Sequence, residues 1–258
     1  MDMQVLNNGN GGEQHKVDQE KLSGKGMVVE RVMAAYHDVH GIQLTRKRAE
    51  EIIFSTSYHE AGHAALYSFT GIGCGARFDC LSVIPDISSS GRMQAGSDPL
   101  NLDFNGDPWN VAWDKAHAKC DVLLSLSGPI AEAIANDEYY SLLSESEYPA
   151  EWDFLRYKTF ADWQAGSDMG RAWTVAEALQ SNTWPAFRVM AQMEKWTEEI
   201  LRTPEVWDVV ETLAGMLINN GVILRDDYFS IGSKIYGRKF SDRIWKRRLH
   251  PKRGKGLA

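Results

Sequence analysis

Apolar residues recur every three or four positions along most of the chain, which is the spacing of amphipathic helices. The first such stretch begins at Val28 and stops at Gly41, a residue type common at helix ends. The second stretch runs to Gly71 and predicts one helix or a helix pair. Two later patterns start at Pro185 and Pro204, because proline suits the first turn of a helix. The predicted helices are 28–41, 44–71, 113–135, 167–180, 185–201 and 204–221.

Two short segments interrupt this helical pattern. Residues 76–85 (ARFDCLSVIP) and 91–95 (GRMQA) are β-prone, and turn-forming Asp and Ser residues lie between them. Residues 96–110 are rich in Pro, Gly, Asn and Asp and predict a loop. We therefore expect a mainly α fold with a small β-sheet, in the α+β class.

Length and composition favour one domain with two tails. A chain of 258 residues with 43% hydrophobic content can bury a full core. Residues 1–26 contain few large apolar side chains and predict a flexible arm. The expected domain is 27–237, followed by a basic tail at 238–258.

The sequence predicts a cytoplasmic protein without membrane insertion. It contains no run of roughly 18 apolar residues, and its N-terminus has no apolar signal core. Cys74, Cys80 and Cys120 are odd in number and form no CxxC pair, which favours a reducing compartment. No GxxxxGK[ST] loop is present, so nothing indicates that this chain binds ATP itself.

Charge is unevenly distributed along the chain. The net charge is −7, but residues 238–255 hold nine Lys or Arg against one Asp. The rest therefore has 19 of the 28 basic and 34 of the 35 acidic residues, a net −15. A basic tail of this kind can contact nucleic acid, another polyanion or the acidic body of the protein.

The sharpest chemical signal is the sequence His59-Glu60-Ala61-Gly62-His63. Residues four apart lie on one face of a helix, so both imidazoles can reach a single metal ion while Glu60 stands beside it. Zinc lowers the pKa of a bound water to roughly 7, and a neighbouring carboxylate can take its proton. The motif predicts a hydrolytic zinc site, with His59 and His63 as ligands and Glu60 as base.

The segment Tyr58-His59-Glu60-Ala61-Gly62-His63-Ala64 resembles the active-site helix of the FtsH-type zinc metallopeptidases. Three later segments are similar to the same family in the same order, and the likeness covers about 50–235. They are LSVIPDISSSGRMQA, similar to its substrate-side strand, LSLSGPIAEAI, similar to its Leu-x-Gly-Arg-x-Ala-Glu helix, and AGSDMGRAWTVAEAL, similar to the segment that brings the third ligand. The resemblance implies a zincin-like peptidase domain at 27–237.

The third ligand has two candidates. Asp168 opens a helix and matches the position that the resemblance implies, whereas Glu132 would give the common two-His, one-Glu set. Glu132 could equally hold a ligand imidazole from outside the metal shell. The sequence also departs from the family: Pro129 stands where an Arg is usual, and no ATPase module or membrane anchor is present.

The segment after the motif suggests how substrate binds. An edge strand beside the metal could pair with an extended peptide through main-chain hydrogen bonds. We expect substrate at this strand. The four residues concerned are Ser82, Val83, Ile84 and Pro85.

The expected function is zinc-dependent endopeptidase activity on unfolded or flexible proteins, by a metal-bound water that Glu60 activates. One alternative is a non-catalytic scaffold that uses its basic tail to bind an anionic partner. Another is a partner-dependent subunit that needs an oligomer of its own chain or an ATPase in trans. The intact Glu60 argues against the scaffold, because a retired site has no need of its base.

Overall fold

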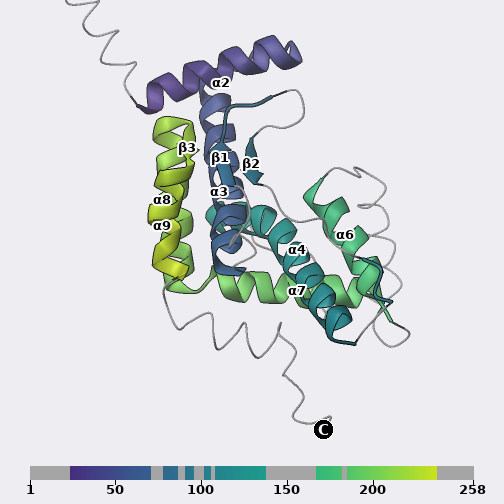
Figure 1. The fold of residues 1–258 in the computed structure, drawn as a ribbon. Coiled ribbons are helices and arrows are strands. Elements are labelled where there is room, and N and C mark those ends of the chain that lie inside the picture. Colours follow the sequence, from purple (N-terminus) through teal and green to yellow (C-terminus); the bar gives the residue numbers. More distant parts are fainter. Residues whose placement is uncertain are drawn as a thin grey trace, which may run out of the picture.

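The computed structural model describes residues 24–70, 78–86, 91–95, 102–105, 108–137, 167–181 and 185–236. These residues are mostly helical, with one small antiparallel sheet, so the predicted α+β class is confirmed (Figure 1). No described helix is both long enough and apolar enough to cross a membrane. The basic tail at 238–258 and residues 1–23 of the predicted arm lie outside the described residues.

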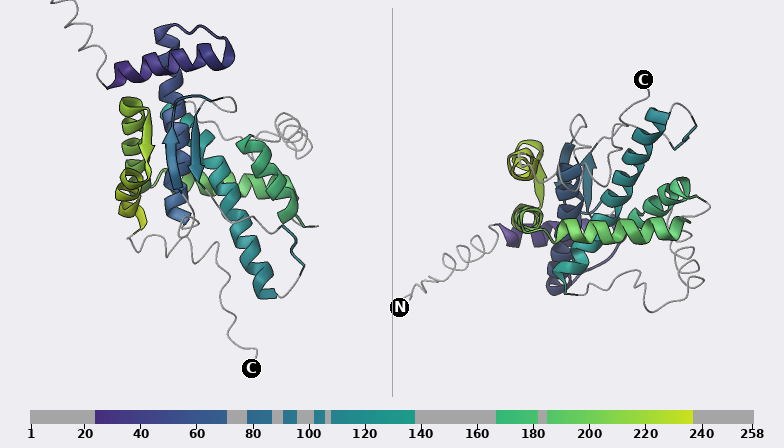
Figure 2. Two further views of the ribbon diagram at one scale, coloured as in Figure 1. Left: turned by 45° about the horizontal axis from the view of Figure 1, so that its top comes forward. Right: turned by 90° about the horizontal axis from the view of Figure 1, so that it is seen from below.

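Helix α3 (Arg46–Thr70) forms the centre of the molecule. Figures 1 and 2 show α8 and α9 on one side of it and α4, α6 and α7 on the other. Its second half is buried on every side and is built from small residues such as Ala61, Gly62, Ala64 and Ala65. Small side chains let neighbouring helices approach closely, so the motif-bearing half of α3 is packed from several directions.

Helix α2 (Lys25–His40) lies across one end of α3 (Figure 1). It ends where predicted, at Gly41, which adopts a left-handed conformation with φ 66° and donates its N–H to the His37 carbonyl. A left-handed residue at this position is the common glycine stop signal. The Thr45 hydroxyl then accepts the N–H of Arg48 and starts α3.

Helix α4 (Pro108–Ala135) crosses α3 at close range. A Cβ atom on Gly62 would lie only 2.4 Å from the Ser127 carbonyl oxygen and 2.6 Å from the Ala131 Cβ. Only glycine permits this crossing, because any side chain would push the two helices apart. The Gly62 of the HEAGH motif therefore allows α4 to pack directly against the helix that carries the motif.

The sheet has the strand order β2-β1-β3, with β1 (Phe78–Ser82) between β2 (Arg92–Ala95) and β3 (Val222–Leu224). Ser82 is paired with Arg92 on one side and with Val222 on the other. The prediction that this strand offers a free edge is therefore wrong. The sequence pattern missed β3, a three-residue strand that follows Gly221 and occupies the other edge.

The remaining helices are α6 (Asp168–Leu179), α7 (Ala186–Leu201), α8 (Pro204–Asn220) and α9 (Arg225–Tyr236). The pattern predicted all of these except α9. Tyr228 anchors α9 to the core, since its ring stacks on Phe78 at 3.7 Å. Its hydroxyl lies 2.6 Å from the Ser68 hydroxyl and donates to the Ala64 carbonyl at 3.0 Å. This helix thereby supports the buried half of α3 from behind.

Candidate metal centre

Three side chains meet at one point beside α3. The Nε2 atoms of His59 and His63 lie 2.9 and 3.1 Å from Oδ2 of Asp168, and 3.2 Å from each other. The two histidines lie one helical turn apart on α3, and Asp168 is the first residue of α6. Two imidazole nitrogens from one helix and a carboxylate oxygen from a residue at least 105 positions later thus lie around a common centre.

The spacing of these atoms suits a zinc ion. Zinc takes imidazole nitrogen and carboxylate oxygen at about 2.0–2.2 Å, so tetrahedral ligand atoms lie roughly 3.4 Å apart. The observed separations of 2.9–3.2 Å would need to widen by only a few tenths of an ångström. A set of two imidazoles and one carboxylate also favours zinc over calcium or magnesium, which prefer oxygen ligands throughout.

A glycine leaves room at this centre. A Cβ atom on Gly128 of α4 would lie 2.4 Å from Nε2 of His63 and 2.7 Å from Nε2 of His59. Any side chain at this position would therefore compete for the space in front of both donor atoms. The Leu-Ser-Gly segment of α4 brings bare backbone against the cluster, which the sequence alone did not reveal.

The far nitrogen of each imidazole has its own acceptor. Nδ1 of His59 lies 3.0 Å from Oε2 of Glu132, and Nδ1 of His63 lies 2.7 Å from the Leu124 carbonyl oxygen. A proton on each Nδ1 leaves each Nε2 free to bind a metal, as is usual for metal-binding histidines. Glu132 thus lies behind a ligand, while Asp168 lies among the donor atoms.

Two carboxylates, Asp168 and Glu132, shape the charge of the cluster. Burial lowers the pKa of His59, but hydrogen bonds to Asp168 and Glu132 outweigh burial and raise this pKa to about 10. Burial acts in the opposite sense on Asp168, yet hydrogen bonds from both imidazoles hold the pKa of this carboxyl well below its usual range. The hydrogen bond from His59 also lowers the pKa of Glu132. The cluster therefore favours a positive charge, as a metal site must.

Glu60 is buried next to the cluster but is not one of its donors. Burial raises the pKa of Glu60, against the opposing charges of His63 and His59. The Met93 N–H of β2 donates a hydrogen bond to this carboxylate. A buried carboxylate with a raised pKa can take up and return a proton closer to neutral pH than an exposed one.

An ion pair that the sequence analysis missed holds Asp168 in place. Arg171, one turn after Asp168 on α6, donates through Nε and Nη2 to both carboxylate oxygens of the buried Asp121 on α4. The N-cap residue Ser167 accepts the Gly170 N–H and fixes the start of the same helix. No spacing rule could reveal the pair, because 50 residues separate its members.

The four predicted substrate residues lie at the end of the central strand. Ser82 accepts the Ile84 N–H through its hydroxyl, and Val83 donates its own N–H to the Gly221 carbonyl. These three polar groups are therefore hydrogen-bonded within the fold. Within the described residues, the open edge near the cluster is the outer edge of β2, where Met93 meets Glu60.

Comparison with protein-family models, curated proteins and solved structures finds no match for this chain. The interpretation of the site consequently depends on its own geometry.

Proposed function

We propose that this protein is a zinc-dependent metalloendopeptidase with a zincin-like active-site helix. The observation that carries the proposal is the convergence of His59, His63 and Asp168 on one centre, with Glu60 beside them on the same helix as the histidines. The likeness of the HEAGH helix and of three later segments to FtsH-type peptidases supports the same activity.

His59, His63 and Asp168 would hold the zinc ion. When bound, zinc supplies a Lewis acid that polarises the peptide carbonyl and makes water a nucleophile at neutral pH. Glu132 and the Leu124 carbonyl keep the two imidazoles in the tautomer that presents Nε2. The Arg171–Asp121 pair keeps Asp168 directed at the histidines.

Glu60 is the proposed general base and acid. Its carboxylate takes the proton of the attacking water and then returns it to the leaving amine, and its raised pKa suits both steps. The hydrogen bond from the Met93 N–H fixes the orientation of the carboxylate and links it to the strand edge. The proposed catalytic carboxylate of Glu60 is therefore in direct contact with strand β2.

The outer edge of β2 is the proposed peptide platform, in place of the segment from Ser82 to Pro85. A substrate paired with this edge would be extended and bound through its main chain, which gives broad sequence tolerance. Only unfolded or flexible segments can adopt this conformation, so we propose such segments as substrates. An ATPase in trans or self-association would extend the range of substrates without changing the chemistry.

The decisive variant is Glu60→Gln, compared with Glu50→Gln on the same helix. Glu50 is partly exposed and pairs with Arg46 on the surface. The substitution Glu50→Gln therefore makes the same chemical change at a position away from the cluster. We expect Glu60→Gln to keep about one zinc per chain and to lose a factor of at least 100 in turnover of an unfolded protein. Glu50→Gln should match the wild type.

Equal turnover by the wild type and Glu60→Gln, with contaminating proteases excluded by a chelator control, would contradict the catalytic assignment. Zinc binding without any turnover in the wild type would favour the scaffold or the partner-dependent subunit instead.

A further inference from the structure

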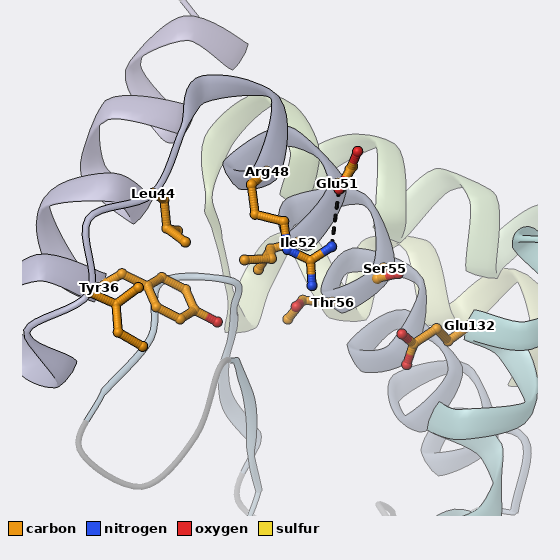
Figure 3. A pocket seen from close by; sticks show the side chains of 9 residues that line it. Tyr36, Leu44, Arg48, Glu51, Ile52, Ser55, Thr56 and Glu132 are labelled. Atoms are coloured by element: carbon orange, nitrogen blue, oxygen red, sulfur yellow. Dashed lines mark hydrogen bonds and ion pairs between the residues drawn. The ribbon is translucent and has the colours of Figure 1, made fainter.

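A pocket of about 490 Å³ lies between α2, the connection to α3 and the first half of α3. Figure 3 shows Tyr36 and Leu44 on one side of it, Ile52 and Thr56 of α3 in the middle, and Glu132 of α4 at the far end. None of the three donor residues of the metal centre lines this pocket. Glu132 connects the two, because it lines the pocket and also contacts Nδ1 of His59.

The pocket and the metal centre lie along one face of α3. Ile52, Thr56 and Glu60 follow one another at four-residue steps, and such residues lie one above the other on a helix. At about 1.5 Å per residue, Thr56 lies roughly 6 Å and Ile52 roughly 12 Å from Glu60 along the helix axis. The pocket therefore begins one turn before the catalytic carboxylate.

Strand β2 and the glycine before it run along the face of α3 that carries Thr56 and Glu60. A Cβ atom on Gly91, just before β2, would lie 2.3 Å from Cγ2 of Thr56 and 3.4 Å from Cγ of Glu60. Met93, two residues later, donates its N–H to Glu60. A peptide paired with the outer edge of β2 would thus pass from the level of Glu60 to the level of Thr56 and reach the mouth of the pocket.

The distance between Glu60 and the pocket along α3 limits which residue of a bound substrate can enter the pocket. An extended chain advances about 3.3 Å per residue, so 6–12 Å corresponds to roughly two to four residues from the scissile bond. Successive side chains of an extended peptide point to opposite sides, so only one or two of them can face α3 in this interval.

The walls favour an apolar occupant. Tyr36, Ile42, Leu44 and Ile52 supply apolar surface, and Ile42 is 48% exposed although it is a large hydrophobic residue. The charges of the pocket are already neutralised: Arg48 bonds Glu51 at 3.0 Å, and Glu132 bonds His59. Among the described residues that line the pocket, no charged side chain is left over to select an ionic one.

From this arrangement we propose that the pocket is a substrate subsite, which binds a large apolar side chain two to four residues from the scissile bond. The inference depends on the proposed endopeptidase activity and adds a specificity to it. The subsite brings α2 into substrate recognition, in addition to the helix and strand that carry the catalyst.

The test is cleavage-site profiling of a peptide library by the full zinc-loaded chain, with Ile42→Asp and a control, Leu224→Asp. Both positions hold exposed apolar residues, but Leu224 lies on β3, away from the pocket. The wild type should prefer Phe, Leu, Ile or Met over Ala about tenfold or more at one position in the stated interval.

Ile42→Asp should remove that preference or turn it toward Lys and Arg, while zinc content and the preferences at other positions stay unchanged. Leu224→Asp should keep the wild-type profile. A wild-type profile without an apolar preference in the interval, or one that Ile42→Asp leaves intact, overturns the subsite alone. Absence of all cleavage by the zinc-loaded wild type overturns the proposed activity and the subsite together.

A second variant, Leu44→Trp, tests the pocket in case Ile42→Asp fails to fold. The larger side chain would fill the pocket without adding a charge. This variant should exclude large side chains from the same position and favour Gly and Ala there. An unchanged preference for large apolar residues in a folded, zinc-bound Leu44→Trp protein would also contradict the subsite.

Discussion

Two glycines decide whether a metal can sit beside α3. Gly62 lets α4 approach, because a Cβ there would collide with the Ser127 carbonyl, and Gly128 leaves free the space in front of both imidazoles. Sequence reasoning identified the two histidines from their four-residue spacing, but it gave no role to either glycine. The reason is physical: the spacing of ligands is local, whereas the need for a missing side chain arises only when two distant helices cross.

Gly128→Ala separates stability from metal binding. Alanine is favoured over glycine inside a helix by about 1 kcal/mol, so helix propensity alone would stabilise the protein. The new methyl group, however, would lie 2.4 Å from Nε2 of His63 and must displace a ligand ring. We expect zinc affinity to fall by at least about 100-fold, measured by competition with a chromogenic chelator. A folded Gly128→Ala protein with wild-type zinc affinity would remove Gly128 from the centre.

Protonation of the ligands sets how zinc binding depends on pH. The neighbouring carboxylates raise the pKa of His59 to about 10, so at neutral pH and without metal this imidazole carries a second proton, on Nε2, that a metal ion must displace. Zinc binding should release about one proton from His59, and the apparent affinity should rise up to tenfold per pH unit between about pH 6 and 8. Calorimetry in buffers of different ionisation enthalpy measures the proton count. A pH-independent affinity would show that His59 does not bind the ion.

At the scale of elements, the position of Asp168, the proposed third ligand, depends on how α6 is held against α4. Arg171 and Asp121 join the two helices one turn from Asp168, and Asp121 is buried. Arg171→Ala would leave a buried carboxylate without this partner and would release the start of α6. We expect the zinc affinity to fall about 10- to 100-fold, as for other residues that support a ligand from behind.

Arg188→Ala is the matched control for this variant, because Arg188 is an exposed arginine near the start of the neighbouring helix α7. Arg171→Lys should recover part of the affinity, since a lysine can still neutralise Asp121 but cannot form both hydrogen bonds. Equal zinc affinities for Arg171→Ala and Arg188→Ala, with both proteins folded by circular dichroism, would rule out the positioning role.

Long helices with caps were predictable, because Gly41, Pro185 and Pro204 mark their ends as local signals. Strand β3 and helix α9 were not, since three residues carry no periodicity and the α9 sequence RDDYFSIGSKIY has a glycine in its interior. The error about Ser82 has the same origin, because β3 is the strand that converts an expected edge into a centre.

At the scale of the whole molecule, the helices around α3 divide their tasks. On one side, α8 and α9 support the helix that carries the HEAGH motif, and on the other, α4 and α6 bring the glycine backbone, the outer hydrogen bonds and Asp168 (Figure 2). Helix α2 closes the end of the same face and forms the pocket with α3 (Figure 3). Motif spacing was enough to propose the ligands on α3, and the resemblance to FtsH-type peptidases pointed to Asp168, whereas the outer edge of β2, open within the described residues, and the pocket both required the fold.

The most direct test of the proposed zinc site is anomalous diffraction at the zinc edge from crystals grown with zinc. We expect one peak per chain, about 2.0–2.2 Å from Nε2 of His59, Nε2 of His63 and a carboxylate oxygen of Asp168, with Glu132 still bonded to Nδ1 of His59. A peak bound by Glu132 in place of Asp168, or no peak at this cluster while both histidines keep their hydrogen bonds to Asp168, would contradict it.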